Sequence, residues 1–320
     1  MSKLFRIAGV LALAAGSPPA VAYPDGPLRI VVAFPPGGAN DVLARLVCPQ
    51  LTSRFKQSCV VENRPGAGGT VGTAVVAAAN AEGTVLLLGS TGAQAVAPSL
   101  YSRLPYDQSR DLTPVSLVAT SGNLVLVHPV LPAKNVRELI ALAKRERNGL
   151  SFASQGNGST GHLATALFSS MAGIEMVHVP YKGDALALVD LLAGNVPLLF
   201  SGIPPGLPHV KSGRLRLLAV TTGQRLAALP DVPTVGESAL PGYDVTTWYG
   251  IFVSRRVDAA NVSQLAEVIA QTVAQPAMQT SITHQGMQAS SNSPQAFRAL
   301  VDRDIERWGK FVRSLGLRVD

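Results

Sequence analysis

Glycine- and hydroxyl-rich segments follow several short, apolar runs of the sequence, and they carry the clearest chemistry in the chain. These segments are Pro35–Asp41, Gly89–Gly92, Ser154–His162 and Pro180–Gly183. Where such a segment leads from a strand into a helix, the first helical N–H groups lack a backbone partner and point outward. Those groups, together with serine and threonine hydroxyls, bind anions such as carboxylates or phosphates. The sequence therefore predicts a site that holds an anion.

The common sequence motifs of catalytic sites are missing from the chain. The chain has no Gly-x-Ser-x-Gly turn, no P-loop and no His-Glu-x-x-His pair. Ser159 and His162 lie one helical turn apart, and a periplasmic hydrolase that uses this pair is the alternative function. Because no acid is assigned to complete the pair, we expect ligand capture, with no enzymatic activity and no catalytic residue.

The segment Gly156–Gly161 also matches the dinucleotide fingerprint Gly-x-Gly-x-x-Gly. That fingerprint needs an acid at the end of the next strand to bind the ribose, but this strand leads into Pro180-Tyr181. We therefore expect no dinucleotide and no other cofactor. The five histidines show none of the spacings typical of metal ligands, so no metal site is expected.

The elements that must position these segments alternate along the chain. Candidate strands are 28–34, 59–62, 85–88, 124–128, 150–153, 176–179, 196–200 and 215–220. Helical spacing of apolar residues occurs at 42–55, 71–79, 136–147, 162–172, 186–193, 262–274 and 294–315. This alternation predicts βαβ units with a parallel sheet, whose ligands bind outside the carboxyl ends of the strands. The glycine-rich segments should therefore converge on one cleft.

The charge and the cysteines narrow the class of protein. The formal net charge of +7 comes from 27 Lys and Arg against 20 Asp and Glu. The basic residues are scattered singly, which argues against a nucleic-acid surface. Cys48 and Cys59 are the only cysteines. An exported chain permits a disulfide between them, and two free buried thiols are the alternative.

Residues 1–22 have the pattern of a secretory signal peptide, with a basic start, a short apolar stretch and Ala20-Val-Ala22 as the cleavage site. We expect cleavage after Ala22 and, in a bacterium, a location in the periplasm. The remaining chain of about 300 residues is long enough for two domains. Breaks rich in Pro and Gly near residues 122 and 240 predict domain 1 at 23–122 plus 240–320. Domain 2, at 123–239, is inserted into it.

Six motifs, in order along the chain, resemble those of a known family. They are Tyr23-Pro24, Phe34–Gly38, Val61–Gly69, Leu104–Asp107, Val177–Gly183 and Leu229–Thr234. Together they resemble the motifs of the solute-binding receptors of tripartite tricarboxylate transporters, the Bug receptors, over essentially the whole chain after the signal. The resemblance implies an α/β protein with the type II periplasmic-binding-protein fold, in which two α/β domains enclose a ligand cleft.

The resemblance also implies a function, which is to capture a small carboxylate-containing ligand by two-domain closure and deliver it to membrane permease subunits. A receptor that acts in signalling, with a sensor as its partner, is a further alternative. In the family, the loop after the first strand and the glycine-rich loop of the second domain hold the ligand. The ligand-binding residues expected here are Pro35, Gly37, Gly38, Ala39, Asp41, Ser90, Ser154, Gly156, Ser159, Thr160, His162, Tyr181 and Ser201. We expect a monomer that binds no nucleic acid.

Two residues of this set have a structural alternative. A carboxylate at Asp41 stabilises the first turn of its helix without touching a ligand. His162 lies in the first turn of the next domain's helix, where a positive charge opposes the helix dipole, so a neutral, hydrogen-bonding histidine is expected.

The chain departs from the family pattern after one strand. Family members often carry Phe-Asp-Asn-Leu-Pro where this chain has Phe200-Ser-Gly-Ile-Pro204. The family's acid, which could contact a ligand amine or shape the floor of the site, is replaced by Ser201. We therefore expect a ligand without a cationic group in preference to an amino acid.

Overall fold

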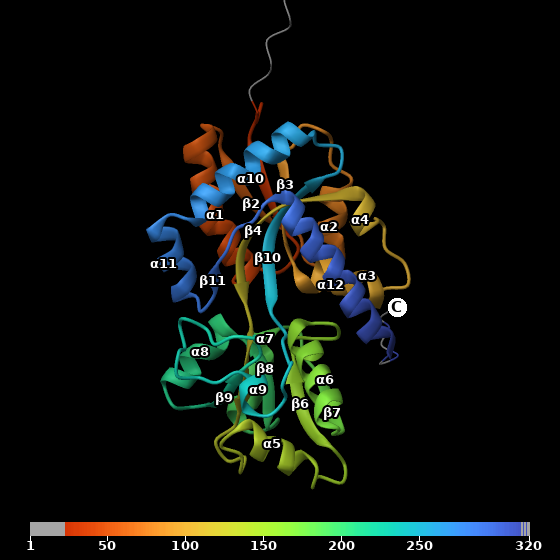
Figure 1. Cartoon of the computed structure of the whole chain (residues 1–320), viewed down its shortest axis with the longest axis vertical. Coiled ribbons are helices and arrows are strands. Elements are labelled where there is room, and N and C mark those ends of the chain that lie inside the picture. The colour runs from red at the N-terminus through yellow and green to blue at the C-terminus, as the bar shows by residue number, and fades with distance from the viewer. Residues whose placement is uncertain (1–22, 315, 317, 319–320) are drawn as a thin grey trace, which may run out of the picture.

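The computed structural model describes residues 23–314, 316 and 318, and these form two α/β halves stacked end to end (Figure 1). The predicted signal peptide lies outside the described residues. The strands are β1 Leu28–Val32, β2 Cys59–Asn63, β3 Val85–Ser90, β4 Leu112–Ser121, β5 Asn123–Val127, β6 Leu150–Ser154, β7 Met176–Pro180, β8 Leu198–Gly202, β9 Arg216–Val220, β10 Thr247–Ser254 and β11 Gln288–Ala289. The first half contains a sheet in the order β11-β4-β10-β3-β1-β2, and the second a sheet in the order β7-β6-β8-β5-β9.

Helices surround both sheets. They are α1 Ala39–Phe55, α2 Thr70–Ala77, α3 Ala97–Leu100, α4 Gln108–Asp111, α5 Val136–Ala143, α6 Thr160–Ala172, α7 Asp184–Ala193, α8 Ile203–Lys211, α9 Val235–Ser238, α10 Ala259–Val273, α11 Pro276–His284 and α12 Pro294–Ser314, with short turns η1 Ala67–Gly69 and η2 Gly92–Val96. Each predicted strand and helix has a counterpart here. Among the described residues, no helix combines the length and the apolar character needed to cross a membrane.

The two sheets are mixed, which differs from the parallel sheet expected from the sequence. β1 pairs in parallel with β2 and β3, and β6 pairs in parallel with β7 and β8. β10 runs antiparallel to β3 and β4, and β5 runs antiparallel to β8 and β9. The reason is the path of the chain. β5 and β10 enter a half from the junction, whereas the strands that they pair with run toward it.

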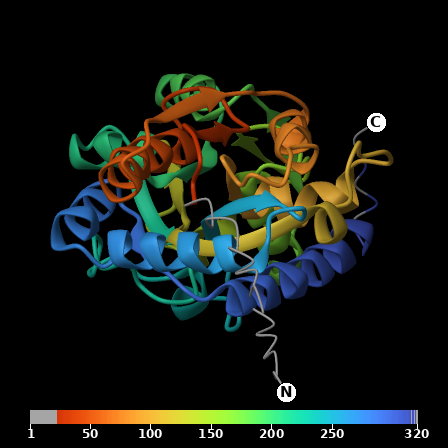
Figure 2. The same cartoon turned by 90° about the horizontal axis from the view of Figure 1, so that it is seen from above.

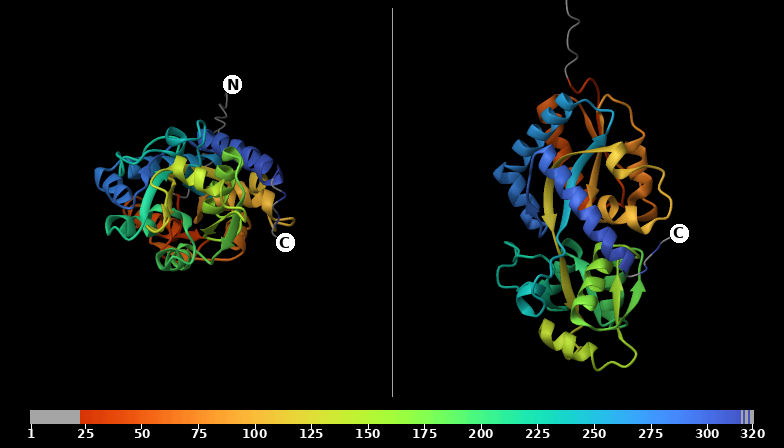
Figure 3. Two further views of the ribbon diagram at one scale, coloured as in Figure 1. Left: turned by 90° about the horizontal axis from the view of Figure 1, so that it is seen from below. Right: turned by 45° about the vertical axis from the view of Figure 1, so that its right-hand side comes forward.

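The pairing register brings the carboxyl ends of the parallel strands to the junction between the halves (Figure 3). Ser90, the last residue of β3, lies opposite Tyr249 near the start of β10. Gly202, the last residue of β8, lies opposite Asn123, the first residue of β5. Only Gly122 separates β4 from β5. The loops that follow β1, β3, β6, β7 and β8 therefore all face this junction.

Alternate residues of β1 divide the core of the first half into two layers, and helices cover both faces of its sheet (Figure 2). Leu28, Ile30 and Val32 pack with apolar residues of α1 and α10. Val31 points to the other face, where residues of α2 and α12 pack. These side chains are fully buried, so the end of β1, and the loop after it, has a fixed position.

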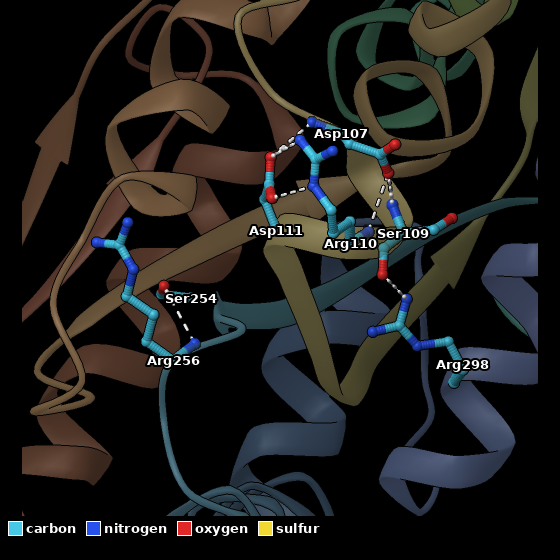
Figure 4. A network of polar contacts seen from close by, with 7 residues as sticks. All are labelled: Asp107, Ser109, Arg110, Asp111, Ser254, Arg256 and Arg298. Carbon is cyan, nitrogen blue, oxygen red and sulfur yellow. Dashed lines mark hydrogen bonds and ion pairs between the residues drawn. The ribbon is translucent and has the colours of Figure 1, made fainter.

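A polar network holds the end of the first sheet that lies far from the junction (Figure 4). Asp107 caps α4 by accepting hydrogen bonds from the backbone N–H groups of Ser109 and Arg110, at 3.0 and 2.9 Å. Arg298 of α12 donates to the carbonyl oxygens of Ser109 and Leu112, at 3.4 and 2.6 Å. Leu112 begins β4, so this network fixes the start of the strand that runs to the junction.

A disulfide joins Cys48 of α1 to Cys59, the first residue of β2, with the two Cα atoms 5.4 Å apart. Between them α1 ends at Phe55, and its C-cap residue Lys56 adopts the left-handed conformation with φ of 59°. The bond therefore holds the helix that follows the first loop against the edge strand of the sheet.

Replacing both cysteines should lower the free energy of unfolding. The bond closes a loop with a sequence separation of 11, and constraining a loop of this size in the unfolded chain contributes about 3 kcal/mol. We expect a loss of this size for Cys48→Ala with Cys59→Ala, measured by urea unfolding of the mature chain. The wild type in a reductant serves as the control and should match the variant. Equal stability of the variant and the oxidised wild type would contradict the prediction.

Candidate functional site

The loop after β1 leads into α1 with an uncapped helix start. Gly37 has a φ of +86°, which favours glycine, and Gly38 at the N-cap supplies no side-chain cap. The backbone N–H groups of Ala39, Asn40 and Asp41 have no hydrogen-bond partner among the described residues. Unpaired N–H groups of this kind, at the positive end of the helix dipole, are suited to an anion.

Asp41 holds this loop in shape. Its Oδ2 accepts hydrogen bonds from the Gly37 N–H and from Arg45 Nε, both at 3.0 Å, and its Oδ1 accepts one from Asn63 Nδ2 at 2.9 Å. Burial acts to raise the pKa of Asp41, but the hydrogen bonds from Arg45, Gly37 and Asn63 outweigh it and lower the pKa below its usual value. The carboxylate is thus ionised and committed within the protein, and ligand binding by Asp41 stays a prediction.

Most backbone N–H groups of the glycine-rich loop after β6 are hydrogen-bonded within the loop itself. Within this loop, the N–H groups without a partner among the described residues belong to Gln155, Asn157 and Thr160. The other donors bond inside the loop, and these bonds are Gly156 N to Ser154 Oγ at 3.1 Å, Gly158 N to His162 Nδ1 at 3.1 Å, Ser159 N to Gly156 O at 3.1 Å, Gly161 N to Gln155 Oε1 at 3.2 Å and His162 N to Ser159 Oγ at 3.3 Å. The start of α6 is therefore largely capped, in contrast to that of α1.

Two stacked histidines, His162 and His178, support this loop. The rings of His162 and His178 lie 3.9 Å apart between centroids, and Phe152 stacks on His178 at 4.9 Å. His178 Nε2 lies 2.6 Å from Ser154 Oγ. Burial, and then the neighbouring His178, lowers the pKa of His162 to about 4. A neutral His162 ring can accept the hydrogen bond from Gly158 at its Nδ1, so its role here is to hold the loop.

The Ser159 and His162 side chains are not arranged as a nucleophile and its base. Ser159 Oγ accepts from the backbone N–H of His162 at 3.3 Å, and His162 Nδ1 accepts from Gly158 N–H at 3.1 Å. A general base must accept the proton of the nucleophile's own hydroxyl. The hydrolase alternative is therefore not favoured.

A partly exposed carboxylate that the sequence reasoning missed, Asp184, lies beside the second loop. Asp184 Oδ1 accepts hydrogen bonds from Gln155 Nε2 at 2.7 Å, Ser201 Oγ at 3.0 Å and the Gly202 N–H at 3.2 Å. Burial raises the pKa of Asp184, although these three hydrogen bonds oppose the effect. A signal existed in the sequence, because Asp184 follows Gly183 in a first helical turn, as Asp41 follows the glycines of the first loop.

Other expected ligand-binding side chains are buried or already paired. Ser90 is buried at the end of β3. Tyr181 donates its hydroxyl to Asp190 Oδ2 at 2.7 Å, and burial followed by this bond raises the pKa of Tyr181 to about 12. Pro35, Gly37 and Gly38 remain exposed on the first loop. Their contact with a ligand stays a prediction.

Glycines at the junction show how closely the two halves approach. A methyl group placed on Gly92, in η2, would lie 3.9 Å from Thr160 Cγ2 at the start of α6. A methyl group on Gly158 would overlap Leu100 of α3. At Gly38, by contrast, a methyl group would find only Pro35 O, at 3.9 Å. The loops after β3 and β6 therefore touch, while the Cβ position of Gly38 has open surroundings.

Two hollows elsewhere on the surface are lined by none of the expected ligand-binding residues. One, of about 430 Å³, lies between α5, α6 and α9 and includes Arg137 and Lys144. The other, of about 360 Å³, lies beside α4 and includes Tyr106 and Arg256. Neither collects unpaired backbone donors at strand ends, as the junction does.

The sequence matches the family described as the tripartite tricarboxylate transporter family receptor over residues 43–317. The chain belongs to this family. The receptor also resembles solved structures along nearly its whole length. "R. palustris Rpa4515 with adipate" has a TM-score of 0.85 and 34% sequence identity, covering 92% of this chain and 99% of that chain.

Two further structures extend the similarity. The periplasmic binding protein BugD has a TM-score of 0.82 and 30% identity, covering 92% of this chain and 99% of its own. MatC (Rpa3494) from Rhodopseudomonas palustris, with bound malate, has a TM-score of 0.81 and 29% identity, covering 91% and 99%. The family and the two-domain α/β fold of a periplasmic binding protein, both predicted from the sequence, are confirmed.

The stability of the receptor should fall in mild acid because of His162. The folded pKa of about 4 lies below the unfolded value of 6.5, so the unfolded chain takes up the proton more readily between these values. Its contribution is complete above pH 6.5 and is lost as the pH falls toward 4, with a loss of about 2 kcal/mol between pH 7 and pH 5. His162→Asn retains an acceptor for Gly158 without titrating, so it should show a smaller loss in urea unfolding. An identical pH dependence in both proteins would refute this role.

Proposed function

We propose that this receptor binds a small organic carboxylate at the junction of its two halves and delivers it to the permease subunits of a tripartite tricarboxylate-type transporter. The observation that carries the proposal is the uncapped start of α1. Ala39, Asn40 and Asp41 present unpaired N–H groups there, beside open space at Gly38. A carboxylate satisfies such groups with charge-assisted hydrogen bonds. The adipate and malate in two similar structures support this ligand class.

The position of Thr160 supports closure of the two halves around the ligand as part of this proposal. Its unpaired N–H lies at the start of α6, and its methyl group faces Gly92 across the junction. A ligand that bonds to α1 and α6 together gains contacts only when the halves are closed. That difference in affinity between the open and closed states is what drives closure.

The hinges belong to the same proposal. The first lies at Gly122, between β4 and β5. Before the second hinge, Tyr243 OH donates to Ala164 O and Val245 N donates to Thr221 O, both at 2.8 Å. Because these bonds hold Tyr243 and Val245 to the second half, they favour a hinge after Val245. This is slightly later in the chain than the boundary near residue 240 expected from the sequence.

The proposed receptor acts in the periplasm, as a monomer, after cleavage behind Ala22. Its membership of a receptor family, and its similarity to the periplasmic binding protein BugD, support this location. Capture without turnover is expected, because Ser159 and His162 are committed to the loop. The thirteen ligand-binding residues named from the sequence remain part of this proposal, with the backbone at Ala39 and Thr160 at its centre.

A larger side chain at Gly38 tests the proposal. Gly38 has a φ of −80° and open surroundings, so Gly38→Val should fold normally and block the ligand carboxylate. We expect affinities for adipate and malate, measured by isothermal titration calorimetry, to fall about tenfold or more, the effect of losing one charge-assisted hydrogen bond.

Gly26→Val provides the matched control. Gly26 also has nothing near its Cβ position, but it precedes β1 at the end opposite the loop. The control should bind as the wild type does. Wild-type affinity in Gly38→Val, for ligands that the wild type binds, would rule out α1 as the carboxylate site.

A further inference from the structure

The chain passes between the halves for the second time at Thr246, and the residues before this crossing are bonded to the second half. Asp244 Oδ1 accepts a hydrogen bond from the Gly223 N–H at 3.0 Å. The Val245 N–H donates to Thr221 O at 2.8 Å. Thr221 and Gly223 follow β9 of the second half. The segment that leads into Thr246 is therefore held to that half.

Trp248, which comes after the crossing, is bonded to the first half. Its backbone N–H donates to Thr91 Oγ1 at 2.9 Å, and its indole Nε1 donates to Asp304 Oδ2 at 2.7 Å. Both bonds are buried. Thr91 follows β3, and Asp304 lies on α12. The segment after Thr246 is therefore held to the first half, and Thr246 itself is the hinge residue.

The same helix, α12, reaches across this hinge through Arg307, one helical turn after Asp304. Arg307 Nη2 donates to the backbone carbonyl oxygen of Asp244 at 2.5 Å. Its guanidinium also lies over the ring of Trp308, 5.1 Å from the centroid, and Trp308 is buried in the core. One helix of the first half thus contacts the chain on both sides of the crossing.

We propose that the hydrogen bond from Arg307 to Asp244 O is a latch that favours the closed arrangement of the halves and so raises the affinity for each ligand. Asp244 moves with the second half and Arg307 moves with α12, so a rotation at Thr246 separates the two groups. The latch then stabilises the arrangement in which the halves touch, but not the open one.

An interaction that differs between two states shifts their populations. The apparent affinity for a ligand that needs the closed state rises with the fraction of closed receptor. The latch therefore acts on affinity without touching the ligand, and it should affect different ligands equally. This regulation rests on the proposed carboxylate site at the junction.

Arg307→Met tests the latch. Methionine keeps an unbranched apolar side chain beside Trp308 but has no donor for Asp244 O. We expect the affinities for adipate and malate, measured by isothermal titration calorimetry at pH 7, to fall by the same factor, about three- to tenfold, for the loss of one exposed hydrogen bond. Without ligand, small-angle X-ray scattering should give a larger radius of gyration than for the wild type, because the open arrangement gains population.

Lys310→Met provides the matched control. Lys310 lies three residues after Arg307, and its Nζ pairs with Glu306 of the same helix at 2.6 Å. The control therefore makes the same substitution and the same loss of charge, but the ion pair that it removes lies within α12. It should keep the wild-type affinities and the wild-type radius of gyration.

The outcomes separate the latch from the function on which it rests. Wild-type affinity for both ligands in Arg307→Met would overturn the latch, as would a loss confined to one of them. If the wild type binds neither adipate nor malate, the carboxylate site is overturned. An unchanged radius of gyration in Arg307→Met would then overturn the latch as well.

Discussion

One continuous extended segment, formed by β4, Gly122 and β5, passes through both sheets, and the rest of the structure is arranged around it. Gly122 is closely enclosed, since a methyl group there would lie 2.7 Å from Thr222 Cγ2. Asn123 fixes the entry to the second half, with its N–H donating to Thr221 Oγ1 at 2.7 Å and its Nδ2 to Phe200 O at 3.2 Å. Because β5 starts at this point, the strands that run toward the first half must end beside it. The convergence of the loops is thus a result of topology.

At the junction, side chains and backbone have different tasks. The Asp41 carboxylate, the His162 ring and the Gln155 amide are all used to hold loops in place. The groups that remain uncommitted are chiefly backbone N–H groups at the starts of α1 and α6. A ligand at the proposed site would therefore meet donors whose directions are already set, which lowers the ordering cost of binding.

Much of the fold was predictable, because apolar residues recur at strand or helix spacing in most elements. β4 and β10 escaped prediction for local reasons, since Pro114 and Ser116 interrupt the first and Gly250 lies in the second. The loops of the site were also predictable from their glycines. The roles of their side chains were not, because those depend on contacts between distant positions. Gln155 and Asp184, for example, are separated by 29 residues in the chain.

The contacts between the halves bear on how fast a ligand can leave. Leu100 closes against Gly158, and Ile203 of the second half packs against Gly286 of the first. Contacts of this kind at two places along the junction must break before the halves separate, and the ligand that we propose at this junction would be released through that separation. Its residence time is then governed by the rate of that opening, while its own hydrogen bonds determine how often the open state is visited. A membrane partner that pulls the halves apart would accelerate release without touching the ligand.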